Sequence, residues 1–113
     1  MLIENGDKHI AFSDSASSFD GSKEVVRLLV VTDIAIWLLD KTKDSVAFFR
    51  RIPFRDIESL SLSRLSSDLL VIHNSKEHDL LLRTAKRAEF MFWLMRKYKD
   101  AMTVELHWKF GER

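Results

Sequence analysis

Hydrophobic residues in the first part of the chain come in short runs that predict β-strands. Residues 24–32 (EVVRLLVVT) and 34–39 (IAIWLL) are rich in β-branched and aliphatic side chains, which favour strands. A Thr-Asp pair separates the two runs and predicts the turn of a hairpin. A third run, 46–52 (VAFFRRI), ends at Pro53, because proline has no N–H for a ladder and occurs at strand ends or sheet edges.

Serine and leucine alternate in residues 57–63 (IESLSLS), and this period of two is typical of a half-buried strand with its polar face outward. Residues 68–73 and 79–82 are predicted to be two more strands, joined by a turn at Asn74–Glu77. Ser13–Ser22 (SDSASSFDGS) consists mainly of Ser, Asp and Gly and predicts a turn or flexible loop.

The pattern changes after Thr84, which is a suitable N-cap for a helix. Lys97 and Lys99 lie where cations complement the end of a helix dipole. These features predict a helix over about 85–101, followed by a segment, 103–113, that forms an extra strand or a docking tail. Apolar residues recur in this region at intervals of three and four, the period of one helix face: Ala88, Met91, Phe92, Met95, Tyr98 and Met102.

About seven short strands followed by one helix predict an α+β fold, with an antiparallel β-barrel or sandwich closed by the C-terminal helix. A chain of this length is expected to form one domain, residues 1–113. Because the sequence begins with methionine, we expect this domain to be either a whole protein or the first domain of a longer one.

Composition excludes several classes of function. The chain has no cysteine, which excludes disulfides and thiol nucleophiles and favours a cytoplasmic location. No apolar run reaches the ~18 residues that span a bilayer, so any membrane contact is expected to be peripheral. The formal net charge is +1, without the segregation of charge that a nucleic-acid partner requires, and we expect none.

No sequence feature points to catalysis or to a cofactor. Gly-x-Ser-x-Gly, P-loop and dinucleotide-binding motifs are absent, and the chain has only three glycines with which to build a phosphate cradle. His73 and His78 flank a short connection and are expected to face each other across a hairpin. Asp79 is the one further ligand near these two imidazoles, whereas metal sites usually have three or four protein ligands. We therefore predict surface histidines in preference to a metal site.

Four segments carry a resemblance to a known family: Arg27–Thr32 (RLLVVT), Arg50–Ile52 (RRI), Ile57–Ser63 (IESLSLS) and Ser67–His73 (SDLLVIH). The order of the predicted elements resembles the pleckstrin-homology (PH) superfold, and the sequences of these four segments are most similar to the tail-homology-1 domain of class I myosins. The likeness covers roughly residues 8–100. It implies a non-catalytic targeting or adaptor module of a cytoskeleton-associated protein.

The resemblance also implies binding of anionic phosphoinositide head groups by basic residues around the first two strands. Arg27 matches one basic position of such sites, whereas Val25 occupies another, and the acidic loop 13–22 would repel phosphate. The cations that remain for weak, salt-sensitive adhesion to anionic lipid are Lys23, Arg27, Lys41 and Lys43. The alternative is that these are solvated loop charges.

Aromatic and basic residues suggest a second hypothesis, a protein-interaction or self-association domain that has lost head-group binding. Phe48 and Phe49 are adjacent in a strand and must point to opposite faces, so one of them is exposed or covered by the tail. Trp93 is expected at the edge of the packed helix face. Exposed aromatic and arginine residues are typical of protein interfaces, and the candidates are Phe48, Phe49, Arg50, Arg51, Arg55 and Trp93. For the three arginines, the alternative is an edge strand protected by charge.

Overall fold

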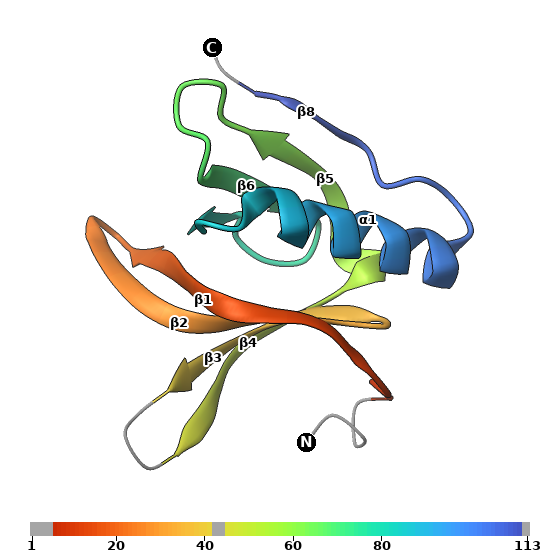
Figure 1. Ribbon diagram of the computed structural model, residues 1–113, viewed down its shortest axis with the longest axis horizontal. Coiled ribbons are helices and arrows are strands. Elements are labelled where there is room, and N and C mark those ends of the chain that lie inside the picture. The colour runs from red at the N-terminus through yellow and green to blue at the C-terminus, as the bar shows by residue number, and fades with distance from the viewer. Residues whose placement is uncertain (1–5, 42–44, 112–113) are drawn as a thin grey trace.

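The computed structural model, which describes residues 6–41 and 45–111, contains one eight-stranded sheet and one long helix (Figure 1). The strand order is β4-β3-β2-β1-β7-β6-β5-β8, and all neighbours are antiparallel except β5 and β8. The elements are β1 (Ile10–Asp20), β2 (Lys23–Thr32), β3 (Ala35–Lys41), β4 (Val46–Pro53), the 3₁₀ turn η2 (Phe54–Asp56), β5 (Ile57–Leu62), β6 (Leu69–Asn74), β7 (Leu80–Arg83), α1 (Arg87–Met102) and β8 (Trp108–Phe110).

The predicted α+β order of strands followed by one helix is confirmed, but the sheet is not closed into a barrel. Within the described residues β4 and β8 are its two edges, because the chain passes from β4 to β5 through η2 without pairing these strands. The sheet bends instead, so that β1–β4 form one layer and β5, β6 and β8 another, with α1 against the opening between them (Figure 1).

The main core lies between the bent sheet and α1. Phe90 and Leu94 of the helix are completely buried against sheet residues such as Leu29 and Leu60, and Tyr98 packs on Phe54 of η2. Full burial of one such leucine is worth about 1.5–3 kcal/mol. The helix is therefore part of the core rather than an appendage.

A second apolar cluster covers the outer face of β2 and β3, around Trp37. Asp7, only 1% exposed, reaches this face and accepts hydrogen bonds from Trp37 Nε1 at 2.9 Å, from Thr32 and from Arg51. A buried carboxylate is tolerated only when it is paired in this way. Asp7 therefore fixes the N-terminal segment to the back of the sheet.

The loop predicted over Ser13–Ser22 is wrong for most of its length, because β1 continues to Asp20 and pairs residue by residue with β2. Only Gly21 and Ser22 form the turn, and Gly21 adopts the positive φ of 65° that favours glycine. Ala16 and Ser18 point inward and are buried. Small side chains fit there, so the low hydrophobicity of the segment does not prevent strand formation.

The predicted N-cap, Thr84, is also wrong. The helix begins at Arg87 with Lys86 in the capping position, and no side chain caps it. Thr84 is buried between β7 and the helix, where its N–H donates to the Asp68 carbonyl at 2.8 Å and its Oγ1 accepts from the Lys86 N–H at 3.3 Å. Its hydroxyl therefore stabilises the turn that precedes the helix.

Candidate functional site

Arg27 lies on the inner face of β2 and is held by neighbouring side chains. Its side chain is only 6% exposed, and its Nε donates to Asp40 Oδ1 at 2.7 Å. Its guanidinium lies 3.5 Å from the centre of the Phe49 ring and also donates to the Ser18 hydroxyl. A carboxylate of the protein thus occupies one side of the guanidinium that a ligand phosphate would otherwise approach.

The other predicted lipid contacts lie near the same end of the sheet. Lys23 is exposed and opens β2 directly after the β1–β2 turn, and Lys41 is the last residue of β3. Lys43 lies outside the described residues. The β1–β2 turn and the last residues of β3 lie on the same side of the molecule, on the left in Figure 1.

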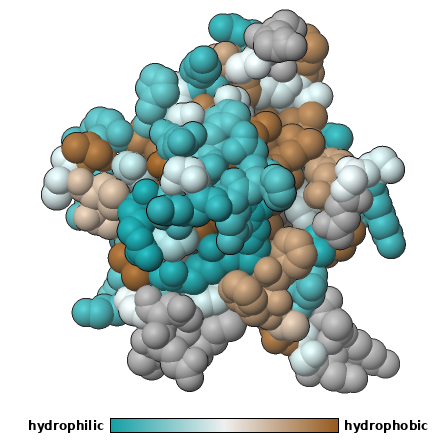
Figure 2. Space-filling model, turned by 180° about the vertical axis from the view of Figure 1, so that it is seen from behind, coloured by the Kyte–Doolittle hydropathy of each residue, from teal (hydrophilic) through white to brown (hydrophobic). Residues whose placement is uncertain are grey.

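Phe48 and Phe49 point to opposite faces of β4, as expected for adjacent strand residues. Phe49 stacks on Arg27 on the inner face, whereas Phe48 packs edge-on against Trp37 on the outer face, with ring centres 5.8 Å apart. Phe48 remains 55% exposed and Phe49 37% exposed. Figure 2, which shows the molecule from behind, has brown hydrophobic residues toward the lower right of this face.

Arg50 and Arg51 hold parts of the fold together. Arg50, 16% exposed, donates to Glu77 at 3.0 Å and to the backbone carbonyl of His78, which ties β4 to the β6–β7 connection. Arg51, 14% exposed, bonds Asp7 at 2.9 Å.

The remaining two interaction candidates, Arg55 and Trp93, lie on other elements than Arg50 and Arg51. Arg55 is exposed in η2. Trp93 of α1 is half-buried against the main core and contacts the exposed Phe92. The structure therefore does not gather the six candidates into one patch.

His73 of β6 forms a hydrogen-bonded chain on the outer face of the sheet, from Ser61 of β5 to Asp79 in the β6–β7 connection. Its Nε2 is 2.7 Å from Ser61 Oγ, and its Nδ1 is 2.7 Å from Asp79 Oδ2. The hydrogen bond from His73 lowers the pKa of the Asp79 carboxyl, against partial burial, which raises it; the Asn74 N–H and the charge of Arg50 also lower it. Over the described ranges, no three His, Asp or Glu residues converge as metal ligands, and His73 instead pairs with one carboxylate.

The sequence did not reveal the role of Arg87 at the start of α1. Its Nη1 lies within hydrogen-bond distance of three backbone carbonyls, those of Ser63, Ser66 and Leu69, at 2.9, 3.1 and 2.7 Å. A cation in the first turn of a helix opposes the helix dipole. The unfavourable position of a positive charge at the start of the helix is therefore the signal in the sequence that Arg87 has a tertiary role.

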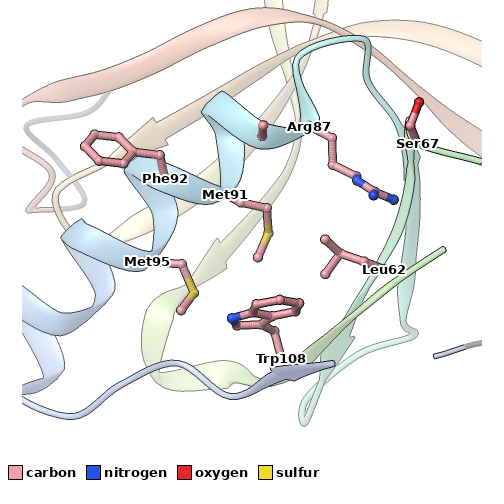
Figure 3. A pocket seen from close by; sticks show the side chains of 8 residues that line it. Leu62, Ser67, Arg87, Met91, Phe92, Met95 and Trp108 are labelled. Carbon is pink, nitrogen blue, oxygen red and sulfur yellow. The ribbon is translucent and has the colours of Figure 1, made fainter. Parts of the chain in front are cut away.

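A hollow of about 510 Å³ lies beside Arg87, between α1 and β8. Figure 3 shows Met91 and Met95 of the helix, Leu62 of β5 and Trp108 of β8 around it. Among the described residues, no helix is long and apolar enough to cross a membrane.

The bent eight-stranded sheet and the helix packed against it define a small PH-like module. The N-terminal PH domain of human ARAP2, solved in solution, superposes with a TM-score of 0.67 at 13% identity, covering 90% of both chains. A similarity at this level concerns the fold alone.

The family is defined by a second comparison. Residues 1–113 match the model of the family described as "Unconventional myosin tail, actin- and lipid-binding", and the chain belongs to this family. The Myosin IA heavy chain of Dictyostelium discoideum is 39% identical over 77 residues, which are 64% of this chain and 8% of that protein. The Myosin ID heavy chain of the same organism is 29% identical over 111 residues, 88% of this chain and 10% of that protein. The chain thus spans about a tenth of the length of these relatives. The predicted likeness to class I myosin tails and to the PH superfold is confirmed.

Proposed function

We propose that this chain is a non-catalytic targeting module that holds a cytoskeleton-associated protein at anionic, phosphoinositide-containing membrane surfaces. The family description, which names lipid and actin binding, supports the general class. The observation that carries the proposal is the shared position of two of the predicted contacts. The β1–β2 turn, next to exposed Lys23, and the end of β3, where Lys41 is the last residue, lie on one side of the molecule (Figure 1).

The environment of Arg27 supports weak adhesion rather than tight recognition of one head group. Lys23, Lys41 and Lys43 are the proposed direct lipid contacts. Arg27 belongs to the same set but reaches a phosphate only by leaving Asp40. At about 1 kcal/mol per cation near an anionic leaflet, three contacts give about 3 kcal/mol, and this contribution weakens as salt is added.

Co-sedimentation with vesicles tests the proposal. Wild type should pellet with vesicles that contain phosphatidylserine and a phosphoinositide, but not with phosphatidylcholine alone, and raised salt should weaken the pelleting. The triple variant Lys23→Ala, Lys41→Ala, Lys43→Ala should lose about 100-fold in affinity. Equal pelleting with both kinds of vesicle would refute the proposal.

A matched control removes the same charge elsewhere. Lys8, Arg96 and Lys99 are exposed and lie on the N-terminal segment and on α1. Their triple alanine variant should keep most of the binding. A loss equal to that of the first variant would indicate a response to net charge alone, and the proposed contact set would be wrong.

A second candidate function is a protein-interaction or self-association domain, favoured by the exposure of Phe48 on edge strand β4. An exposed apolar edge strand is a template for pairing with another chain. Phe48 and the neighbouring Phe49 are the proposed contacts, and the other candidates, which do not form one patch with them, are Arg50, Arg51, Arg55 and Trp93. Light scattering over a range of concentrations should then show a dimer in wild type and a monomer in Phe48→Ser. A wild-type monomer at all concentrations would rule out self-association.

A further inference from the structure

Leu65 is unusually exposed for a large hydrophobic side chain. It lies in the connection between β5 and β6 and is 88% exposed, whereas the other exposed large hydrophobic residues of the described ranges do not exceed 69%. Single exposed leucines are common on proteins and need no explanation by themselves. Leu65 differs from other exposed leucines because it lies in a hydrogen-bonded loop, next to an arginine and an aromatic ring.

The loop that carries Leu65 is held by a dense set of hydrogen bonds. Ser63 Oγ accepts the backbone N–H groups of Leu65 and Ser66 at 3.2 and 3.0 Å. From the other side, Arg87 Nη1 contacts the carbonyls of Ser63, Ser66 and Leu69, and Figure 3 shows Arg87 extending toward this loop. The loop therefore presents Leu65 in a fixed position, and little conformational entropy is lost when that side chain enters a partner.

The surroundings of Leu65 are apolar and cationic. Arg64 is exposed, and its guanidinium lies 4.7 Å from the centre of the Phe110 ring, which is itself 41% exposed. The acidic residue of the loop, Asp68, is paired with Arg83 at 3.2 Å. An apolar tip flanked by an arginine and an aromatic ring has the chemistry of the interfacial region of an anionic bilayer.

The loop also lies beside the proposed lipid-binding end. Arg83 contacts both Asp68 of the loop and Glu24, the neighbour of Lys23, at 3.2 and 3.5 Å. In Figure 1 the β5–β6 connection and the β1–β2 turn project from the same side of the molecule. A membrane that contacts Lys23 is therefore within reach of Leu65.

We infer that Leu65 inserts into the interfacial region of the anionic membrane, with Arg64 at the lipid phosphates. The inference rests on the proposed function and adds an apolar contact to it. The proposed partner is a lipid surface, because Arg64 and the nearby Lys23 match anionic head groups, and the exposed leucine matches the acyl chains below them.

The first test compares two exposed apolar residues. Leu65→Ser should lower the affinity for anionic vesicles about tenfold, equivalent to about 1.4 kcal/mol. Val104→Ser is the matched control, because Val104 is 56% exposed just beyond the far end of α1, and its affinity should equal that of wild type. Because Leu65 buries almost nothing, its replacement should leave the midpoint of urea unfolding unchanged.

The second test locates the side chain. Tryptophan fluorescence of Leu65→Trp should shift to the blue on anionic vesicles and be quenched by lipids brominated in the acyl chains, relative to wild type under the same conditions. Absence of vesicle binding by wild type would overturn both proposals. If wild type binds but Leu65→Ser binds equally well, or Leu65→Trp shows no added quenching, the proposed function stands and the insertion of Leu65 is refuted. Leu65 would then face water or a protein.

Discussion

The ion pair between Arg27 and Asp40 predicts that stability and membrane binding change in opposite directions in Asp40→Asn. The Nε–Oδ1 distance of 2.7 Å is that of a charge-assisted hydrogen bond, and Arg27 is almost completely buried. The substitution keeps the shape of the side chain and an acceptor oxygen but removes the negative charge. Arg27 then keeps a weaker partner and gains freedom to meet an external anion.

The size of both effects follows from the structure. Hydrogen bonds to charged groups contribute about 1.5–3 kcal/mol. Since the Asp40 side chain is 43% exposed, solvent screens the pair, and because asparagine still accepts from Nε, the free energy of unfolding should fall by only about 1 kcal/mol. Removing one negative charge beside an anionic leaflet favours binding by about 1 kcal/mol, or about fivefold in affinity.

Urea unfolding measures the first effect, and co-sedimentation with anionic vesicles at low salt measures the second. Asp100→Asn is the control, because it removes the same charge from an exposed position near the end of α1. Weaker binding by Asp40→Asn, or an equal gain in Asp100→Asn, would refute the view that Asp40 competes with lipid phosphate for Arg27.

Three further predictions concern the second layer of the sheet. In Gly111→Ala the new Cβ would lie 2.7 Å from Ser61 Cβ, so β8 should detach from β5 and its amides should lose hydrogen-exchange protection. A second change, Ser61→Gly, should restore the protection. Full protection in the single variant would contradict the clash. The lowered pKa of Asp79, caused first by its hydrogen bond from His73, means that its stabilising contribution is present above its ordinary value of 3.8 and disappears as the pH falls through the lowered value. As the pH falls below 3.8, the free energy of unfolding should therefore decrease less steeply in Asp79→Asn than in wild type, and identical curves would disprove the coupling. Arg87→Met keeps a long unbranched side chain but removes the Nη1 donor that contacts the carbonyls of Ser63, Ser66 and Leu69, so its stability should fall by about 1–2 kcal/mol and the β5–β6 amides should exchange faster; wild-type exchange rates would show that these contacts are unnecessary.

The elements that local pattern predicts well are those whose side chains carry a clear period. The alternation in β5 corresponds to buried Leu60 and Leu62 with half-buried serines between them. In α1 the predicted face is right at Met91 and Tyr98 but wrong at Ala88 and Phe92, which are exposed, because the buried face is turned toward Phe90 and Leu94. These periods reflect geometry within one element. The sequence therefore predicted the strand, the helix and their order.

The failures arise where a partner distant in sequence decides the outcome. The Ser-rich segment 13–20 is a strand because β2 supplies a complete ladder, and serine has no strong preference of its own that pairing must overcome. Arg27 looks like a free cation in the sequence, because its partner Asp40 comes from the next strand. Lys23 and Lys41 remain predicted lipid contacts, whereas the ion pair of Arg27 depends on the strand register and could not be predicted from its own segment.

The placement of these groups has a consequence for how the module would hold a membrane. Because Arg27 is paired with Asp40, the proposed membrane binding would draw its energy from several weak contacts, and these would differ in their response to salt. The contributions of Lys23 and Lys41 are screened within a Debye length of about 8 Å at physiological ionic strength, whereas transfer of Leu65 from water is not screened. Cations alone would give adhesion that vanishes as salt rises, and Leu65 alone would not distinguish anionic from neutral lipid. In the proposed function their combination would select anionic surfaces through charge and keep the module there through an apolar contact, while the contacts of Arg87 with three carbonyls of the β5–β6 connection would hold Leu65 in place.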